Sequence, residues 1–192
     1  MMLRQACWMS NPEASLQTER LMLRPVTGAD VDVLLAVRND PVIRSTTLSA
    51  EMTVERMQLQ VRRWLDVWRE RDAGTWVMER HGNVIGYVPL DPMGEGYDEV
   101  DPEELELGVI VHSDHWGNGF AGEAGLAVAV DAFTRAGLGQ LFATVDNDNE
   151  QSLALLAKTP QAELISDSDG ELLYRLPNPL MGPSQLPCSD ET

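Results

Sequence analysis

The segment 115–124, with the sequence His-Trp-Gly-Asn-Gly-Phe-Ala-Gly-Glu-Ala, combines residue types that suit anion binding. Its glycines and Ala121 keep side chains away from the main chain, so successive N–H groups can face outward together. A helix is expected to follow, and the N-terminus of a helix carries partial positive charge. The segment therefore predicts a loop that binds a phosphate or pyrophosphate. A tight glycine turn without a ligand is the alternative, although one glycine usually suffices for a turn.

The same loop satisfies the dinucleotide-binding pattern G-x-G-x-x-G at Gly117, Gly119 and Gly122. Five residues separate the preceding strand, which ends at Val111, from Gly117, whereas a dinucleotide-binding fold turns almost at once after its strand. The seventy residues after Gly122 are also too few for a full doubly wound sheet. A dinucleotide enzyme is therefore the less favoured interpretation.

The segment 91–106 is a second chemical feature, with eight carboxylates and no basic residue. The whole chain has 31 acidic and 14 basic side chains, a formal net charge of −17. Such a balance argues against binding to nucleic acid, which requires clustered Lys and Arg. It indicates either a solvated acidic surface or attraction of a cationic substrate. The three histidines and two cysteines have no spacing typical of metal ligands, so no metal is expected.

Hydrophobic periodicity predicts the elements that position these segments. Strands are expected over residues 20–24, 76–80, 84–88, 105–111, 140–145, 162–165 and 172–176. Helices are expected over 28–39, with Thr27 as the N-cap, and over 53–71, 124–133 and 150–158. Gly82 is expected to supply the positive φ of a hairpin turn. Three strands in sequence before a crossover helix indicate an α+β or α/β arrangement with a mixed sheet, and not a regular βαβ series.

The length of 192 residues suggests one domain. Residues 1–15 lack periodicity and are expected to form a flexible arm, and residues 177–192, with four prolines, a flexible tail. The domain is then expected over residues 16–176. No apolar run approaches the ~18 residues of a membrane helix, and the first twenty residues lack the apolar core of a secretory signal. No membrane association and a cytoplasmic location are expected.

Four motifs in order give the sequence a family resemblance. They are Glu-Arg-Leu-Met-Leu-Arg-Pro at 19–25, Glu-Leu-Gly-Val-Ile-Val at 106–111, Trp-Gly-Asn-Gly-Phe-Ala-Gly-Glu-Ala at 116–124 and Asn-Glu-Gln-Ser at 149–152. Together they resemble the GNAT acetyltransferases, specifically the branch with ribosomal-protein N-terminal acetyltransferases. The resemblance covers about residues 16–176. It implies a single mixed, mostly antiparallel sheet flanked by helices, with a splay between the fourth and fifth strands.

The resemblance implies acetyl-CoA as cosubstrate and assigns residues to it. The strand containing Val109, Ile110 and Val111 would splay from its neighbour to admit the pantetheine arm, and Asn149 would contact that arm. The pyrophosphate would be held by the loop residues Trp116, Gly117, Asn118, Gly119, Phe120, Ala121 and Gly122.

Acetyl transfer to an amine requires removal of a proton from the ammonium, polarisation of the carbonyl and protonation of the departing thiolate. The resemblance assigns Glu106 as base, through water, and Ser152 as acid. Two departures from the family stand out. Many members have a Tyr in the helix over 150–158, which here has none, and the usual Leu-Gly-Phe after that helix is replaced by Thr-Pro-Gln at 159–161.

The expected acceptor is a primary amine, either a protein N-terminus or a cationic small molecule. The family lines its acceptor side with the first two helices, which makes Trp64, Trp68, Glu99, Glu103 and Glu104 candidate acceptor-binding residues. Members of the branch often form a homodimer. A non-catalytic acyl-CoA-binding or regulatory domain of the same fold is the main alternative.

Overall fold

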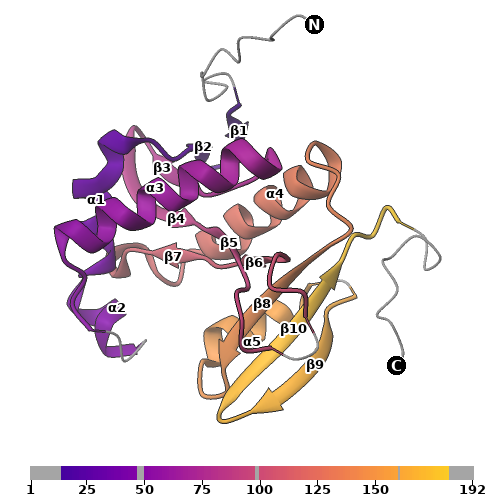
Figure 1. Cartoon of the computed structure of the whole chain (residues 1–192). Helices are drawn as coiled ribbons and strands as arrows, with labels where there is room; N and C mark the ends of the chain where they lie inside the picture. Colours follow the sequence, from indigo (N-terminus) through magenta and orange to yellow (C-terminus); the bar gives the residue numbers. More distant parts are fainter. Residues whose placement is uncertain (1–13, 47–49, 98–99, 160, 182–192) are drawn as a thin grey trace, which may run out of the picture.

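The computed structural model describes residues 14–46, 50–97, 100–159 and 161–181. The expected N-terminal arm and C-terminal tail therefore lie largely outside the described residues, as do Cys7 and Cys188. Two five-stranded sheets with helices on both sides make up the described chain (Figure 1). The predicted class, a mixed sheet flanked by helices, is confirmed, with the sheet divided in two.

The first sheet is antiparallel throughout. Its order is β1 (Leu16–Gln17), β2 (Met22–Pro25), β3 (Trp76–Arg80), β4 (Asn83–Val88) and β7 (Ile110–Val111). The predicted hairpin joins β3 to β4 through His81 and Gly82, at φ 52° and 78°. Positive φ at both central residues is the geometry that matches the twist of a two-residue hairpin.

The second sheet carries the C-terminal half. Its order is β5 (Leu90–Pro92), β6 (Leu105–Leu107), β8 (Gln140–Asp146), β10 (Glu171–Pro177) and β9 (Glu163–Ser168). One pair in this sheet is parallel, β6 with β8, where Glu106 lies opposite Phe142. The other three pairs are antiparallel.

Two chain segments pass from one sheet to the other, and their crossing points lie next to each other. β4 continues into β5 across Pro89, and β6 continues into β7 across Gly108 and Val109. Gly108 donates its N–H to the Pro89 carbonyl at 3.1 Å, and a Cβ on Gly108 would lie 3.0 Å from the Pro89 ring. The expectation of one continuous strand over 105–111 was therefore wrong. A proline has no N–H to continue the ladder, so pairing breaks at this point.

This break parts β7 from β8. β8 pairs with β6 at Glu106, whereas β7 pairs with β4. Val109 lies between β6 and β7 and belongs to neither strand. The gap corresponds to the splay that the family resemblance implied.

Helices α1 to α3 lie on one side of the first sheet and α4 on the other, whereas α5 lies behind the strands of the second sheet (Figure 1). α1 (Val31–Arg38), α2 (Pro41–Thr46) and α3 (Val54–Arg71) share a buried cluster with Val77 and Tyr87. α4 (Phe120–Thr134) packs against the opposite face in the larger core, and α5 (Glu150–Leu156) adds Leu156 to that core. Short 3₁₀ turns, Gly28–Asp30 and Ser113–His115, precede α1 and α4. None of the described helices has the length and apolar character needed to cross a bilayer.

α2 and the start of α4 differ from expectation. α2 was not predicted; Asp40 starts it by accepting the N–H groups of Val42 and Ile43. α4 begins four residues earlier than predicted, directly after Gly119. Short polar caps and glycines at helix starts leave little hydrophobic periodicity, so pattern alone places such boundaries poorly.

Candidate active site

The glycine loop before α4 has an open main chain. Gly117 and Gly119 adopt φ of 75° and 78°, in the region that favours glycine. A Cβ on Gly117 would meet nothing within 4 Å, so its surroundings are open. The first helical hydrogen bond of α4 runs from the Glu123 N–H to the Gly119 carbonyl at 3.2 Å. The N–H groups just before it are those that a helix start offers to a ligand.

The loop is held on its outer side by Arg20 from the chain before β2. Arg20 Nε donates to Glu123 at 2.7 Å and Nη1 to the Asn118 carbonyl at 2.8 Å. The Arg20 N–H and the Thr18 hydroxyl also donate to Glu123. Burial acts to raise the pKa of Glu123, but the bonds from Thr18 and Arg20 outweigh it and hold this pKa below its usual value. The one acidic side chain in the first turn of α4 is thus neutralised locally.

The ring of Phe120 is buried, so only the main chain of this residue is open to a ligand at the loop. The guanidinium groups of Arg20 and Arg80 lie 4.7 Å and 5.2 Å from the centre of this ring. Arg80 Nε is buried without a hydrogen-bond partner among the described residues. Arg20 is already paired with Glu123, so Arg80 is the positive charge that adjoins the loop without an ion pair among the described residues.

Trp116 and Asn118 brace the loop from within. Trp116 Nε1 donates to the Val111 carbonyl at 2.7 Å, which closes the turn after β7. Asn118 Nδ2 donates to the carbonyls of His115 and Trp116, each at 3.0 Å. The side chains of these two predicted residues are therefore engaged in shaping the loop.

α5 lies against the start of α4. A Cβ on Gly122 would lie 2.9 Å from a terminal methyl of Leu155 in α5, so a larger residue would require that side chain to shift. Asn149 caps α5, its Oδ1 accepting the Ser152 N–H at 3.1 Å. The Asn149 Nδ2 group stays available as a donor, and Ser152 is half-buried in the first turn of α5. Both predicted residues thus lie on the helix next to the glycine loop.

Alternation along 105–111 places Glu106 on the other face of the sheet. Leu105, Leu107, Val109 and Val111 pack in the core that contains α4, whereas Ile110 packs with α1 and α3. Successive side chains in a strand point to opposite faces. Glu106 therefore faces the α3 side, with the gap between β7 and β8 next to it.

Glu106 bridges the strands where they begin to part. Its Oε1 accepts the Thr144 N–H at 3.2 Å and also the Thr144 hydroxyl. The carboxylate thus occupies a position where the main chain of a continuing strand would have paired with β8. Tyr97 lies close by, donating its hydroxyl to Glu171 at 2.8 Å. Burial, followed by the bond to Glu171, raises the pKa of Tyr97 to about 12.

Asp91 is a residue of this face that the sequence did not single out. It lies directly opposite Glu106 in the β5–β6 pair, so both side chains point to one face. Its Oδ1 accepts the Trp64 Nε1–H at 2.8 Å and an N–H of Gln60 at 3.3 Å. Burial, with a further contribution from the Glu106 charge, raises the pKa of Asp91 to about 6, although Trp64 and Arg63 oppose the rise.

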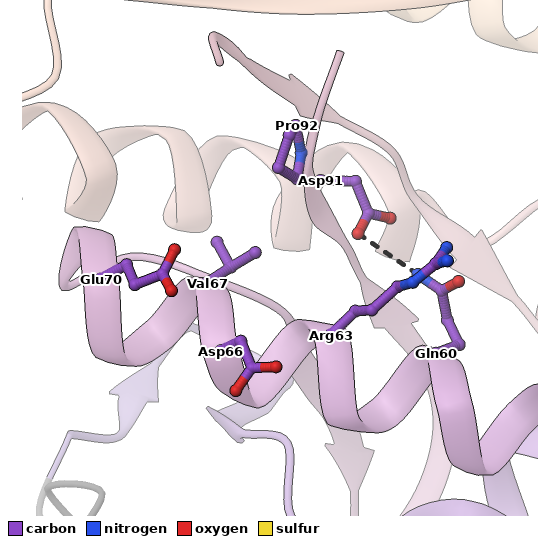
Figure 2. A pocket seen from close by; sticks show the side chains of 7 residues that line it. All are labelled: Gln60, Arg63, Asp66, Val67, Glu70, Asp91 and Pro92. Carbon is purple, nitrogen blue, oxygen red and sulfur yellow. Dashed lines mark hydrogen bonds between the residues drawn. The ribbon is translucent and has the colours of Figure 1, made fainter. Parts of the chain in front are cut away.

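A cavity of about 480 Å³ opens beside Asp91, between α3 and β5. Figure 2 shows Asp91 pointing from the strand toward Gln60 and Arg63, with Asp66 and Glu70 further along α3. No strand was expected over Leu90–Pro92. The polar contacts of Asp91 come from α3, far away in sequence, so no local signal marked this residue.

The two predicted tryptophans are packing residues in this structure. Trp64 is 3% exposed and its ring centre lies 5.4 Å from that of Tyr87. Trp68 Nε1 donates to the Thr75 carbonyl at 3.0 Å, and its ring meets Trp76 edge-on. Trp64 still contributes to the acidic face, through its bond to Asp91.

The predicted acidic residues of segment 91–106 are engaged separately. Glu103 forms an ion pair with Arg71 at the end of α3. Glu104 accepts an N–H of Gln140 at 2.9 Å. Glu99 lies outside the described residues. Within the described ranges, no group of three or more His, Cys, Asp or Glu is placed to hold a metal ion.

The residues described above form two faces of the sheet, which meet at the gap between β7 and β8. One face has an open main-chain loop at a helix start, suited to the phosphates of a carrier. The other has a carboxylate pair, suited to binding an ammonium group and removing its proton. This arrangement defines an enzyme that transfers a group from a phosphate-bearing carrier to a second substrate across the sheet.

Comparison with known proteins agrees with that class. Residues 20–159 match the family described as the acetyltransferase (GNAT) domain. The chain belongs to this family and is an acetyltransferase.

Three similar proteins illustrate the match. The uncharacterized N-acetyltransferase YoaA of Bacillus subtilis is 30% identical over 146 residues, covering 74% of this chain and 80% of that protein. A putative GNAT-family acetyltransferase from Bordetella pertussis superposes with a TM-score of 0.73 at 23% identity, covering 84% of this chain and 98% of that one. The ribosomal L7/L12 α-N-protein acetyltransferase RimL, in complex with coenzyme A, gives a TM-score of 0.63 at 13% identity, over 82% and 94% of the two chains.

Proposed function

We propose that this chain transfers the acetyl group of acetyl-CoA directly to a primary amine, with Glu106 as the proton acceptor. The observation that carries the proposal is the placement of Glu106. It lies at the point where β6 turns into β7, on the opposite face from the glycine loop. An amine reaching Glu106 from the α3 side and a carrier held on the α4 side would meet at the gap.

The residues present fit acetyl-CoA. Open space at Gly117 and free helix-start N–H groups suit the pyrophosphate, with Arg80 adding positive charge nearby. Gly108 donates its N–H to Pro89, and Val109 follows it at the break between β6 and β7, where its N–H would be placed to donate to a carbonyl. Asn149, the N-cap of α5, would supply its amide group to the pantetheine arm. Acetyl-CoA, when bound, supplies a thioester that an amine can attack.

The chain's own groups then handle the protons. Glu106 takes a proton from the acceptor ammonium, directly or through one water, which frees the nitrogen lone pair. The Val109 N–H stabilises negative charge on the carbonyl oxygen. Ser152, in the first turn of α5, would donate a proton to the departing sulfur. Asp91 and the acidic surface favour an acceptor that is cationic, either a small amine or a basic protein N-terminus.

The proposal is tested on the full chain by thermal shift and by thiol release. Acetyl-CoA and CoA should raise the Tm, and NAD should not. Release of CoA thiol should require an amine, with spermidine and a basic peptide bearing a free N-terminus as probes. Binding of CoA with no thiol release for either amine would instead favour a non-catalytic acyl-CoA-binding domain. Stabilisation by NAD alone would favour the dinucleotide interpretation of the glycine loop.

A further inference from the structure

Asp91 and the cavity beside it are not used by the proton transfer described above. The cavity lies between α3 and β5, on the face of the sheet that carries Glu106. Asp91 lines this cavity and also lies directly opposite Glu106 in the β5–β6 pair. One oxygen of Asp91 is fixed by Trp64 and Gln60, two residues one helical turn apart on α3. A carboxylate held in this way presents its second oxygen in a defined direction.

We propose that Asp91 binds the ammonium group of the acceptor and places it against Glu106, with the cavity between α3 and β5 as the route of entry. This inference rests on the proposed function and identifies the acceptor side of the same site. It assigns Asp91 to substrate binding and leaves proton removal to Glu106.

The register of β5 and β6 supports the geometry of this step. Residues directly opposite in an antiparallel pair have Cβ atoms about 4.5–5.5 Å apart, so one ammonium group can contact both carboxylates. The proton balance is simple: the N–H bond breaks, the proton moves to Glu106, and the neutral amine keeps the electron pair. Until the proton is transferred, Asp91 stays ionised and forms an ion pair with the acceptor ammonium.

The charges around the cavity fit a cationic ligand. Its rim includes Glu70 and Asp66 of α3 as well as Asp91, against Arg63. Asp66 is ion-paired with Arg69 at 2.6 Å, so the acidic charge at the rim comes mainly from Asp91 and Glu70. Tyr87 of β4 and Glu106 of β6 are the other titratable groups that act on Asp91. The pKa of Tyr87 is raised by burial, so Tyr87 stays neutral and adds no charge at the working pH.

The decisive variant is Asp91→Asn. It removes the charge but keeps an oxygen that can accept the Trp64 N–H, so the fold is preserved. We expect the KM for spermidine to rise at least tenfold, with the KM for acetyl-CoA unchanged and kcat within threefold. Glu95→Gln is the matched control, since Glu95 is an exposed carboxylate of the same segment that does not line the cavity. It should leave the KM for spermidine within twofold.

The pH profile separates a binding role from a merely structural one. In the wild type, kcat/KM for spermidine should rise with pH as Asp91 ionises, because burial raises the pKa of Asp91 to about 6. In Asp91→Asn this rise should disappear. An unchanged KM and an unchanged pH profile in Asp91→Asn would overturn the inference. So would equal rises of KM in Asp91→Asn and Glu95→Gln, since that would indicate a general surface charge. Absence of amine-dependent thiol release in the wild type itself would refute the proposed function instead.

Discussion

The two faces that meet at the strand gap are built in different ways. The face with the glycine loop is made from main-chain groups of consecutive residues, 115–124, with Arg20 as a distant brace. The acidic face is made from side chains of four separate segments, represented by Trp64, Asp91, Glu106 and Thr144. The first face can be recognised from a short stretch of sequence, and the second exists only after folding.

The difference also resolves an electrostatic conflict. A chain of net charge −17 repels an anionic carrier, yet the loop side offers helix-start N–H groups, the nearby guanidinium of Arg80 and a Glu123 neutralised by Arg20. Asp91 and Glu106 lie on the other side of the sheet. Under the proposed function, separating the two kinds of charge would allow one protein to bind an anionic carrier and a cationic acceptor.

The largest effect is expected on the acidic face, from Glu106→Gln. Glutamine keeps an oxygen for the Thr144 N–H and hydroxyl, so the bridge to β8 survives while the proton acceptor is lost. General-base catalysis contributes typically 10²–10⁴-fold, so kcat should fall at least a hundredfold. CoA affinity, measured by calorimetry, should stay within twofold. A turnover near that of the wild type would remove Glu106 from the mechanism.

On the loop face, Gly119→Ala should weaken CoA binding. Gly119 has φ 78°, where a Cβ costs about 1 kcal/mol, and relaxation of this strain would turn the neighbouring N–H groups away from the ligand. We expect a five- to tenfold higher Kd for CoA, and an unchanged KM for the amine. Gly137→Ala is the control, with φ 72° and open surroundings after α4. Equal effects of both changes on Kd would show that the loop main chain does not hold the carrier.

The sequence predicted these two faces unequally. The glycine loop, the flanking helix, the hairpin at His81–Gly82 and the α3 boundaries followed from patterns within short windows. The strand break at Gly108–Val109 did not, because residues 105–111 alternate as one strand and the cause of the break is Pro89 on a neighbouring segment. Asp91 was missed for the same reason, since its environment comes from α3 and β6.

A smaller effect, on stability, is expected from breaking the contact between Arg20 and Glu123 that braces the glycine loop. Glu123 is a partly buried carboxylate that accepts bonds from Thr18 and Arg20, so Glu123→Gln loses the ion pair with Arg20. Partly buried ion pairs of this kind contribute about 1–2 kcal/mol, and the free energy of unfolding should fall by that amount in urea denaturation. CoA affinity should fall only two- to threefold. A change confined to CoA affinity would contradict a bracing role.

The smallest effect is a pH dependence of stability that arises from Asp91 on the acidic face. An aspartate in the unfolded chain titrates near 3.9, whereas burial raises the pKa of Asp91 to about 6. Between these values the folded state binds more protons than the unfolded one, so the wild type loses stability as pH rises toward 6 and does not regain it above. Asp91→Asn has no charge to desolvate. It should therefore be more stable than the wild type at pH 7.5 and equal to it below pH 4, as measured by urea denaturation at both pH values. Lower stability of the variant at pH 7.5 would show that the ionised carboxylate strengthens the fold through Trp64, and that this corner of the acidic face is primarily structural.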